Sequence, residues 1–147
     1  MCKRLWALSL ASIILLLGLS GACAQTLGPA ASYAELQALL LHARNGDVIL
    51  VSGDLSAAGQ EPLQSGASVR ISSADGQTAS ISGLRLRDAS IAFDHIHLAD
   101  TLEISGSSNI LLGTAVTVVG GSRQSGISFA GNGTLIVERG CVVEGGS

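Results

Sequence analysis

Hydrophobic and polar residues alternate along much of the chain, and the pattern is clearest at 91–98, which reads Ile-Ala-Phe-Asp-His-Ile-His-Leu. Successive side chains of a β-strand point to opposite faces, so the Ile and Phe of the first half share one face. The Ile and Leu of the second half share one face too. Because two polar residues, Asp94 and His95, separate the two apolar pairs, the second pair does not continue the alternation of the first. The pattern therefore predicts two short strands joined by a bend, with both apolar pairs directed into one core.

One segment has helical periodicity instead. Its apolar residues recur at helical spacing: Tyr33, Leu36, Leu39, Leu40 and Ala43. Ser32 precedes the segment and Glu35 follows three residues later, which is the spacing of a capping box. Asn45-Gly46 is a typical helix end, and the aliphatic run 48–51 after it predicts a buried strand. We expect 25–31 to be a lead-in broken by Gly28-Pro29.

The remainder of the chain has only strand-like patterns. Residues 53–66 are expected to form a polar loop around Leu55 and Leu63. Beyond it, short alternating strands are predicted at 69–71, 79–81, 84–86, 102–104, 110–112, 116–118, 127–129, 135–137 and 141–143.

These strands fall into three repeating sets with spacings between 18 and 26 residues. The sets begin at Leu84, Leu102 and Ile127; at Ile91, Ile110 and Leu135; and at Ile96, Val116 and Val142. Three strands per repeat predict an all-β fold, a parallel β-helix (solenoid) of about four coils, in which stacking buries a continuous core. The residues 120–125 are expected to be an insertion at a bend, and the helix is expected to cap the N-terminal end of the core.

A β-sandwich is the alternative, since it also uses short strands at intervals of about 8–12 residues. The predicted turns are only one to three small residues long, and the whole chain has 2 prolines. These features favour the solenoid.

The residues 32–37 and 45–51, together with the phrase Ile-x-Phe-Asp-His-Ile-x-Leu, resemble the N-terminal cap and a coil of secreted right-handed parallel β-helix proteins, the pectate-lyase-like superfamily. The resemblance implies a right-handed solenoid. It does not fix the function, because the superfamily includes lyases, hydrolases, adhesins and autotransporter passengers. The residues 129–132 also match the Phe-x-x-Asn element of polymorphic outer-membrane adhesins, but the companion Gly-Gly-Ala-Ile element is absent from the sequence.

The first 24 residues have the pattern of a secretory signal peptide. Lys3 and Arg4 precede an apolar run at 5–19, and Ala22-Cys23-Ala24 offers small residues for cleavage before Gln25. A membrane anchor is one alternative, but it needs a longer apolar run. A lipoprotein acylated at Cys23 is the other, but its motif needs a large aliphatic residue at the position of Ser20. We thus expect a secreted or cell-surface protein with no membrane span after cleavage, a lead-in, helix and first strand at 25–52, and coils at 53–147.

Composition excludes several classes of protein. The chain has 19 glycines and 13% charged residues, too little charge for a disordered protein. Without the leader it has six arginines and eleven acidic residues, a formal net charge of −5, and it has no basic cluster for nucleic acid. Only Cys141 remains, so an internal disulfide is excluded.

Candidate chemistry is sparse. Arg85 and Arg87 share the outer face of one strand, and with Asp94 and His97 they are the candidates for a polysaccharide-binding groove, although solvated surface residues would give the same pattern. Asp94, His95 and His97 could also be weighed as metal ligands, but two histidines at i, i+2 without a further partner are a weak signal. We predict no catalytic residues, no metal and no cofactor.

The sequence therefore favours a secreted or cell-surface scaffold of adhesin type without a catalytic site. The alternative is the N-terminal part of a polysaccharide lyase or glycoside hydrolase. The expected partners are a carbohydrate or a host or cell-surface protein. Residues 142–147 read like the middle of a coil, which predicts either coils beyond residue 147 or end-to-end stacking through an open C-terminal coil.

Overall fold

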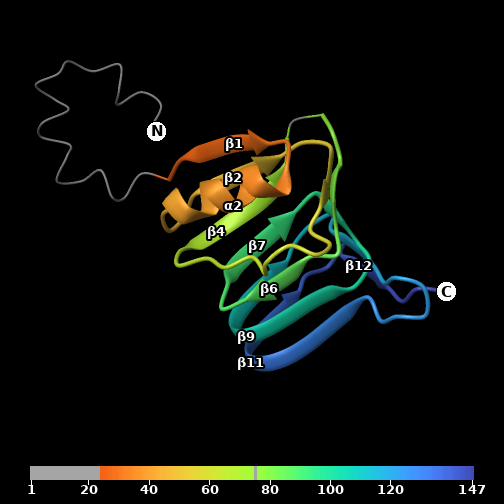
Figure 1. Cartoon of the computed structure of the whole chain (residues 1–147). Helices are drawn as coiled ribbons and strands as arrows, with labels where there is room; N and C mark the ends of the chain where they lie inside the picture. Colours follow the sequence, from red (N-terminus) through yellow and green to blue (C-terminus); the bar gives the residue numbers. More distant parts are fainter. Residues whose placement is uncertain (1–23, 75) are drawn as a thin grey trace, which may run out of the picture.

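The structure is a computed structural model that describes residues 24–74 and 76–147; the predicted signal peptide lies outside the described residues, apart from Ala24. It is a parallel β-solenoid of about five turns with one short helix near its N-terminal end, which confirms the all-β solenoid expected with about four coils (Figure 1). The elements are β1 (Thr26–Ala30), α2 (Tyr33–His42), β2 (Val48–Val51), β3 (Asp54–Ser56), β4 (Ser68–Ser73), β5 (Ala79–Ser82), β6 (Arg85–Arg87), β7 (Ser90–Asp94), β8 (Ile96–Ala99), β9 (Leu102–Leu112), β10 (Thr117–Val119), β11 (Ile127–Val137) and β12 (Val142–Glu144).

The strands form two parallel sheets that run the length of the stack. One has the order β1-β2-β4-β7-β9-β11, and the other has the order β3-β5-β8-β10-β12. The long strands β9 and β11 turn a corner of the coil: the first part of β9 pairs with β6 and its last part pairs with β7. Each full coil therefore has three sides, two of which join into one bent strand in the last two coils.

The bend predicted within 91–98 is confirmed. His95 separates β7 from β8 and has a positive φ of 48°, which turns the chain between the two strands. Ile91, Phe93, Ile96 and Leu98 are all at most 2% exposed, so both apolar pairs do point into one core.

Two of the three predicted sets of stacked residues are correct. Leu102 pairs with Ile127, and Ile110 pairs with both Ile91 and Leu135. The third set is wrong at its last member, because Val142 pairs with the outward-facing Thr117. Cys141, one residue earlier, lies level with Val116 and is the half-buried residue that packs against the core.

The predicted capping helix is confirmed at the N-terminal end, where α2 packs on β1 and β2 (Figure 1). The Ser32 side chain accepts a hydrogen bond from the Glu35 backbone N–H at 3.2 Å, and the Glu35 carboxylate accepts one from the Ala31 N–H at 2.7 Å. Leu36 and Leu40 are buried, which joins the helix to the solenoid core.

Two segments expected to be irregular are strands. The lead-in contains β1, which pairs with β2 and extends the first sheet by one strand. The expected loop 53–66 contains β3, which pairs with β5 through a register that places Leu55 beside Ile81. The expected insertion 120–125 is a connection between β10 and β11, as predicted.

Candidate functional site: a groove on the outer face of the first sheet

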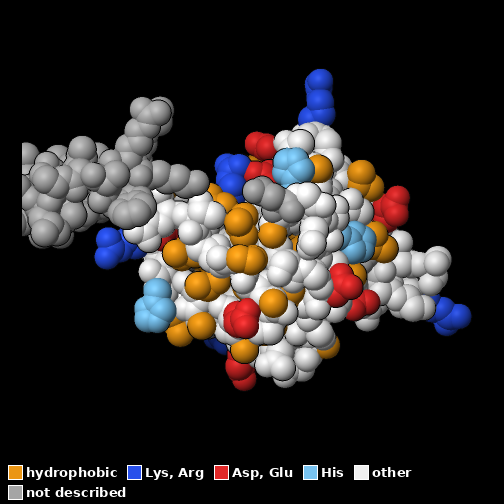
Figure 2. Space-filling model, turned by 90° about the horizontal axis from the view of Figure 1, so that it is seen from above, with side chains coloured by type: hydrophobic (Ala, Val, Ile, Leu, Met, Phe, Trp, Pro, Cys, Tyr) orange, Lys and Arg blue, Asp and Glu red, His pale blue; other side chains and the backbone are white. Residues whose placement is uncertain are grey.

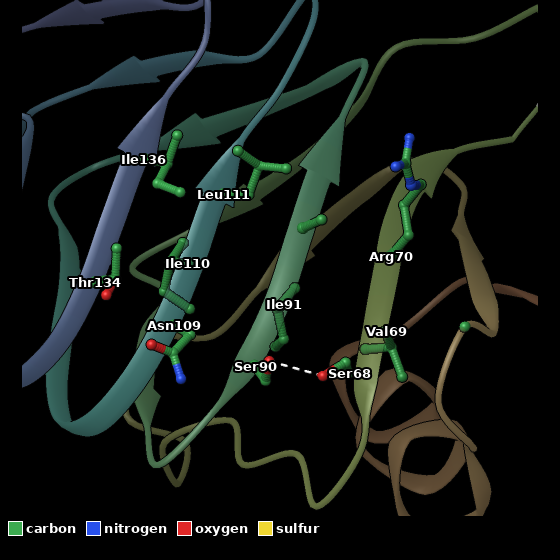
Figure 3. Close-up of a pocket in the computed structure, with 12 residues that line it drawn as sticks. Ser68, Val69, Arg70, Ser90, Ile91, Asn109, Ile110, Leu111, Thr134 and Ile136 are labelled. Carbon is green, nitrogen blue, oxygen red and sulfur yellow. Dashed lines mark hydrogen bonds between the residues drawn. The ribbon is translucent and has the colours of Figure 1, made fainter.

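The outward side chains of β4, β7, β9 and β11 line a shallow groove with a volume of about 360 Å³ (Figure 3). It runs across the strands, along the axis of the solenoid. The parallel register produces it, because each outward position stacks on the equivalent position of the next coil at a spacing of about 4.8 Å.

Two outward columns of different character lie side by side in this groove. The polar column consists of Ser68, Ser90, Asn109 and Thr134. The second column begins at Arg70 and continues with the apolar residues Ala92, Leu111 and Ile136. The hydroxyl oxygens of Ser68 and Ser90 lie 3.0 Å apart, within hydrogen-bond distance, so neighbouring coils are already linked along the polar column (Figure 3).

Arg70 is the one charged residue that lines the groove among the described residues, and it is paired. Its guanidinium forms an ion pair with the Asp94 carboxylate from the next coil, and the Asp94 side chain is 18% exposed. The other oxygen of Asp94 accepts a hydrogen bond from the Thr114 backbone N–H at 3.1 Å. Asp94 therefore joins three successive coils, and the groove beside it is close to neutral.

A second hollow, of about 440 Å³, lies over β6 and the first parts of β9 and β11. Arg85, Arg87 and Glu103 line it, together with small residues of the two long strands. Arg85 donates a hydrogen bond to the Gln60 carbonyl, while the Arg87 Nε lies 3.8 Å from an Asp88 oxygen, and the Arg87 side chain is 61% exposed. Arg87 is thus the more available of the two cations.

The four residues proposed for a polysaccharide groove do not line one groove. Arg85 and Arg87 face the second hollow, but Asp94 ends β7 and pairs with Arg70. His97 lies on β8 in the other sheet, where it is half-buried and pairs in register with Ser80 and Thr117. Figure 2 likewise shows charged and histidine side chains scattered over one face of the molecule rather than gathered in a patch.

The described residues contain no group of three or more His, Cys, Asp or Glu side chains placed to hold a metal ion. Across the same residues, each buried side-chain nitrogen or oxygen has a hydrogen-bond partner. Burial raises the pKa of the Cys141 thiol, which keeps it protonated at neutral pH and makes it a poor nucleophile.

The polar column was not identified from the sequence, although a signal for it was present. Each of its members directly precedes an inward residue of one stack: Val69, Ile91, Ile110 and Leu135. Once the inward residues are aligned, the residues before them form an outward column, because neighbours along a strand face opposite sides.

Comparison of the chain with family models, with curated proteins and with solved structures found no match. Within the described residues, no helix combines the length and the apolar character that crossing a membrane requires.

Proposed function

We propose that this chain is an exported, non-catalytic β-helix module of adhesin type, related in architecture to the pectate-lyase-like superfamily, and that it binds a neutral polysaccharide along the groove on its first sheet. The observation that carries the proposal is the pair of columns, one of hydroxyl and amide groups and one of aliphatic groups, which extend side by side over four coils.

The chemistry of the two columns suits an extended sugar chain. The Ser68, Asn109 and Thr134 side chains offer hydrogen-bond donors and acceptors to sugar hydroxyls. The Leu111 and Ile136 side chains offer an apolar surface to the C–H faces of sugar rings. Since Arg70 is paired with Asp94, the groove gives little attraction to an acidic polymer, which favours a neutral one.

Binding of neutral and acidic polysaccharides to the purified chain, measured by affinity electrophoresis and calorimetry, tests this proposal. Leu111→Asp places a carboxylate in the centre of the apolar column and is expected to weaken binding about tenfold or more, about 1.4 kcal/mol. Thr117→Asp is the matched control, since Thr117 is a half-buried outward residue of the second sheet. No binding of any neutral polysaccharide, or equal binding by both variants, would contradict the proposal.

Export is a separate part of the proposal and rests on the pattern of residues 1–24. Intact mass of the exported protein tests it. A product that starts at Gln25 is expected, and a lipid-modified Cys23 at the new N-terminus would place the protein on a membrane instead.

The hollow with Arg85, Arg87 and Glu103 supports a second candidate, part of a lyase or hydrolase that acts on acidic polysaccharides. The test is release of unsaturated or reducing ends from uronate polymers, with and without calcium. If this candidate is correct, the chain releases such ends and Arg87→Ala abolishes the activity. Arg44→Ala is the control and should leave the activity intact, because Arg44 is an exposed arginine beyond the end of α2.

A further inference from the structure

Among the described residues, Asp47 is the one charged side chain that is buried. It is 2% exposed and lies in the turn between α2 and β2. A buried carboxylate destabilises a fold unless its charge is compensated, because the protein interior solvates an anion less well than water does. The partners of Asp47 therefore decide how it affects the first coil.

Both carboxylate oxygens of Asp47 accept hydrogen bonds from backbone N–H groups. Oδ1 accepts one from Gln25 at 2.9 Å, and Oδ2 accepts one from Arg44 at 2.8 Å. Neither nitrogen is charged while it is part of a peptide bond. The ion pairs found within residues 24–74 and 76–147 do not include Asp47. In the uncleaved chain the carboxylate is thus hydrogen-bonded, but no ion pair within these residues balances its charge.

The strand that follows Gln25 fixes the position of its nitrogen. The Gln25 carbonyl accepts a hydrogen bond from the Val48 N–H at 2.8 Å, and the next two residues of β1 pair in register with Val48 and Ile49. β1 and β2 lie side by side at the N-terminal end of the solenoid (Figure 1). The Gln25 nitrogen should therefore stay beside Asp47 whether or not another residue precedes it.

The predicted cleavage before Gln25 changes the chemistry of this nitrogen. Hydrolysis of the Ala24–Gln25 bond by one water molecule leaves a carboxylate on Ala24 and a protonated α-amine on Gln25. The usual pKa of an α-amine is about 7.7–8.0, so this group is mostly an ammonium at neutral pH. Hydrogen bonds between charged groups are stronger than those between neutral groups. Cleavage therefore replaces a neutral donor to Asp47 by a cationic one.

We propose that Asp47 binds the α-ammonium group that removal of the signal peptide creates, and that this ion pair stabilises the first coil of the mature protein. The inference rests on the export proposed above, which makes Gln25 the first residue. Asp47 also contacts the neighbouring elements: Oδ2 accepts from Arg44 at the end of α2, and its carbonyl accepts from the Arg70 N–H of β4 at 2.9 Å. Cleavage thus strengthens the point at which β1, the capping helix and the second coil meet.

Chemical modification of the α-amine tests the ion pair. The chain from Gln25 onward contains every described helix and strand, and it has no lysine, so its α-amine is its one primary amine. Acetylation removes the positive charge and keeps an N–H, as in the uncleaved chain. Reductive dimethylation adds similar bulk but keeps the positive charge. Intact mass verifies each modification and shows that the side-chain amide of Gln25 is retained.

Urea unfolding followed by circular dichroism measures the stability of the three forms. Acetylation is expected to raise the unfolding equilibrium constant about tenfold, about 1.4 kcal/mol, and dimethylation much less. Gln25 is exposed, so water screens the ion pair on one side and limits the effect. An acetylated chain as stable as the unmodified one would overturn the proposal, and so would equal losses on acetylation and dimethylation.

Two variants then identify the carboxylate that pairs with the amine. Asp47→Asn removes the charge, and its side-chain amide faces either the Gln25 or the Arg44 nitrogen, so it lowers stability by itself. The quantity compared is therefore the effect of acetylation within each variant, which should nearly vanish in Asp47→Asn. Asp54→Asn is the matched control, at an exposed carboxylate of β3, and should keep the tenfold effect. Equal effects of acetylation in the two variants would contradict the pairing with Asp47.

The test separates this inference from the proposal of export. The chain is released at Gln25 from a removable N-terminal fusion, so its stability does not depend on how it was exported. An exported product that begins at a residue other than Gln25 would contradict the proposed processing, whatever the unfolding experiments show. A product that does begin at Gln25, together with no effect of acetylation, would contradict only the ion pair with Asp47.

Discussion

At the N-terminal end of the solenoid, α2 lies over the first coil and Ile49 is fully buried; at the C-terminal end, Val137 is 48% exposed. Both residues belong to one inward column, which runs through Ile49, Ile71, Phe93, Leu112 and Val137. The four members before Val137 are all 0% exposed. Because residue type hardly changes along the column, the difference between the two ends arises from what covers them.

The comparison shows how the stability of this fold depends on position along the stack. An inner coil is covered on both sides by neighbouring coils, and the first coil is covered on its outer side by α2 and β1. The last coil gains contacts on one side only. Stability should therefore decrease toward β11 and β12, as expected for a solenoid whose repeats interact mainly with their nearest neighbours.

The largest expected effect is at the capped end. Ile49→Ala removes a fully buried side chain from the start of the column and should lower the free energy of unfolding by about 2–5 kcal/mol. Urea unfolding followed by circular dichroism measures the change. A loss below about 1 kcal/mol would mean that α2 does not close the first coil.

The pairing of strands between coils was predictable from the sequence at positions where a single aliphatic residue follows a bend of small polar residues. The stacks through Ile110 and Leu102 were correct for this reason, since one apolar residue after each bend sets the register. The prediction failed at Cys141, because the neighbouring Val142 and Val143 give no alternation from which a register can be read.

The missed strands β1 and β3 have physical reasons as well. Gly28-Pro29 indicated a break, but proline is tolerated on an edge strand, and β1 lies at an edge of its sheet. In β3 the single apolar residue Leu55 stands between Asp54 and Ser56, too short a pattern to separate from a loop.

The candidate groove was predictable only in part. Arg85 and Arg87 were expected on one outer face, and they line one hollow. Asp94 and His97 were expected in the same groove, but Asp94 pairs with Arg70 at the end of β7, and His97 lies on β8 in the other sheet. Outward columns such as Ser90 and Asn109 become visible only after the register between coils is known.

The helix that closes the N-terminal end offers a smaller test of the same comparison. Ser32→Ala removes the side chain that accepts the Glu35 N–H and should cost about 1 kcal/mol of stability. Ser122→Ala, in the loop before β11, is the control at the open end, where the Ser122 hydroxyl bonds only the Ser147 carbonyl at 3.4 Å. Chemical unfolding of both variants should therefore show a loss for the first and almost none for the second.

At the open end, Val137→Ala should cost less than about 1 kcal/mol in dilute solution, because about half of the side chain is already exposed. Urea unfolding followed by circular dichroism measures the cost. A cost as large as that of Ile49→Ala would remove the distinction between the two ends.

The smallest effect at neutral pH is expected at Tyr33, which closes the capped end from the first turn of α2. Its hydroxyl donates to the Glu61 carbonyl at 2.8 Å, and Tyr33→Phe should cost about 0.5 kcal/mol, because water can replace the donor at the exposed Glu61.

The same residue should become important in alkali. Burial raises the pKa of Tyr33, an effect that the nearby positive charge of Arg85 partly offsets. The unfolded chain loses the tyrosine proton near its usual pKa of about 10, while the folded chain retains it to higher pH. The stability that Tyr33 contributes is therefore complete below pH about 10 and is lost as pH rises through the folded pKa.

The test is clean, because the described part of the chain has one tyrosine and no lysine. In a Cys141→Ser background, which removes the other group whose pKa burial raises, thermal melts between pH 9 and pH 12 should show a falling melting temperature for the parent. Tyr33→Phe should fall much less over the same range. If the two chains lose stability in parallel, the ionisation of Tyr33 does not open the capped end, and the alkaline transition begins elsewhere in the stack.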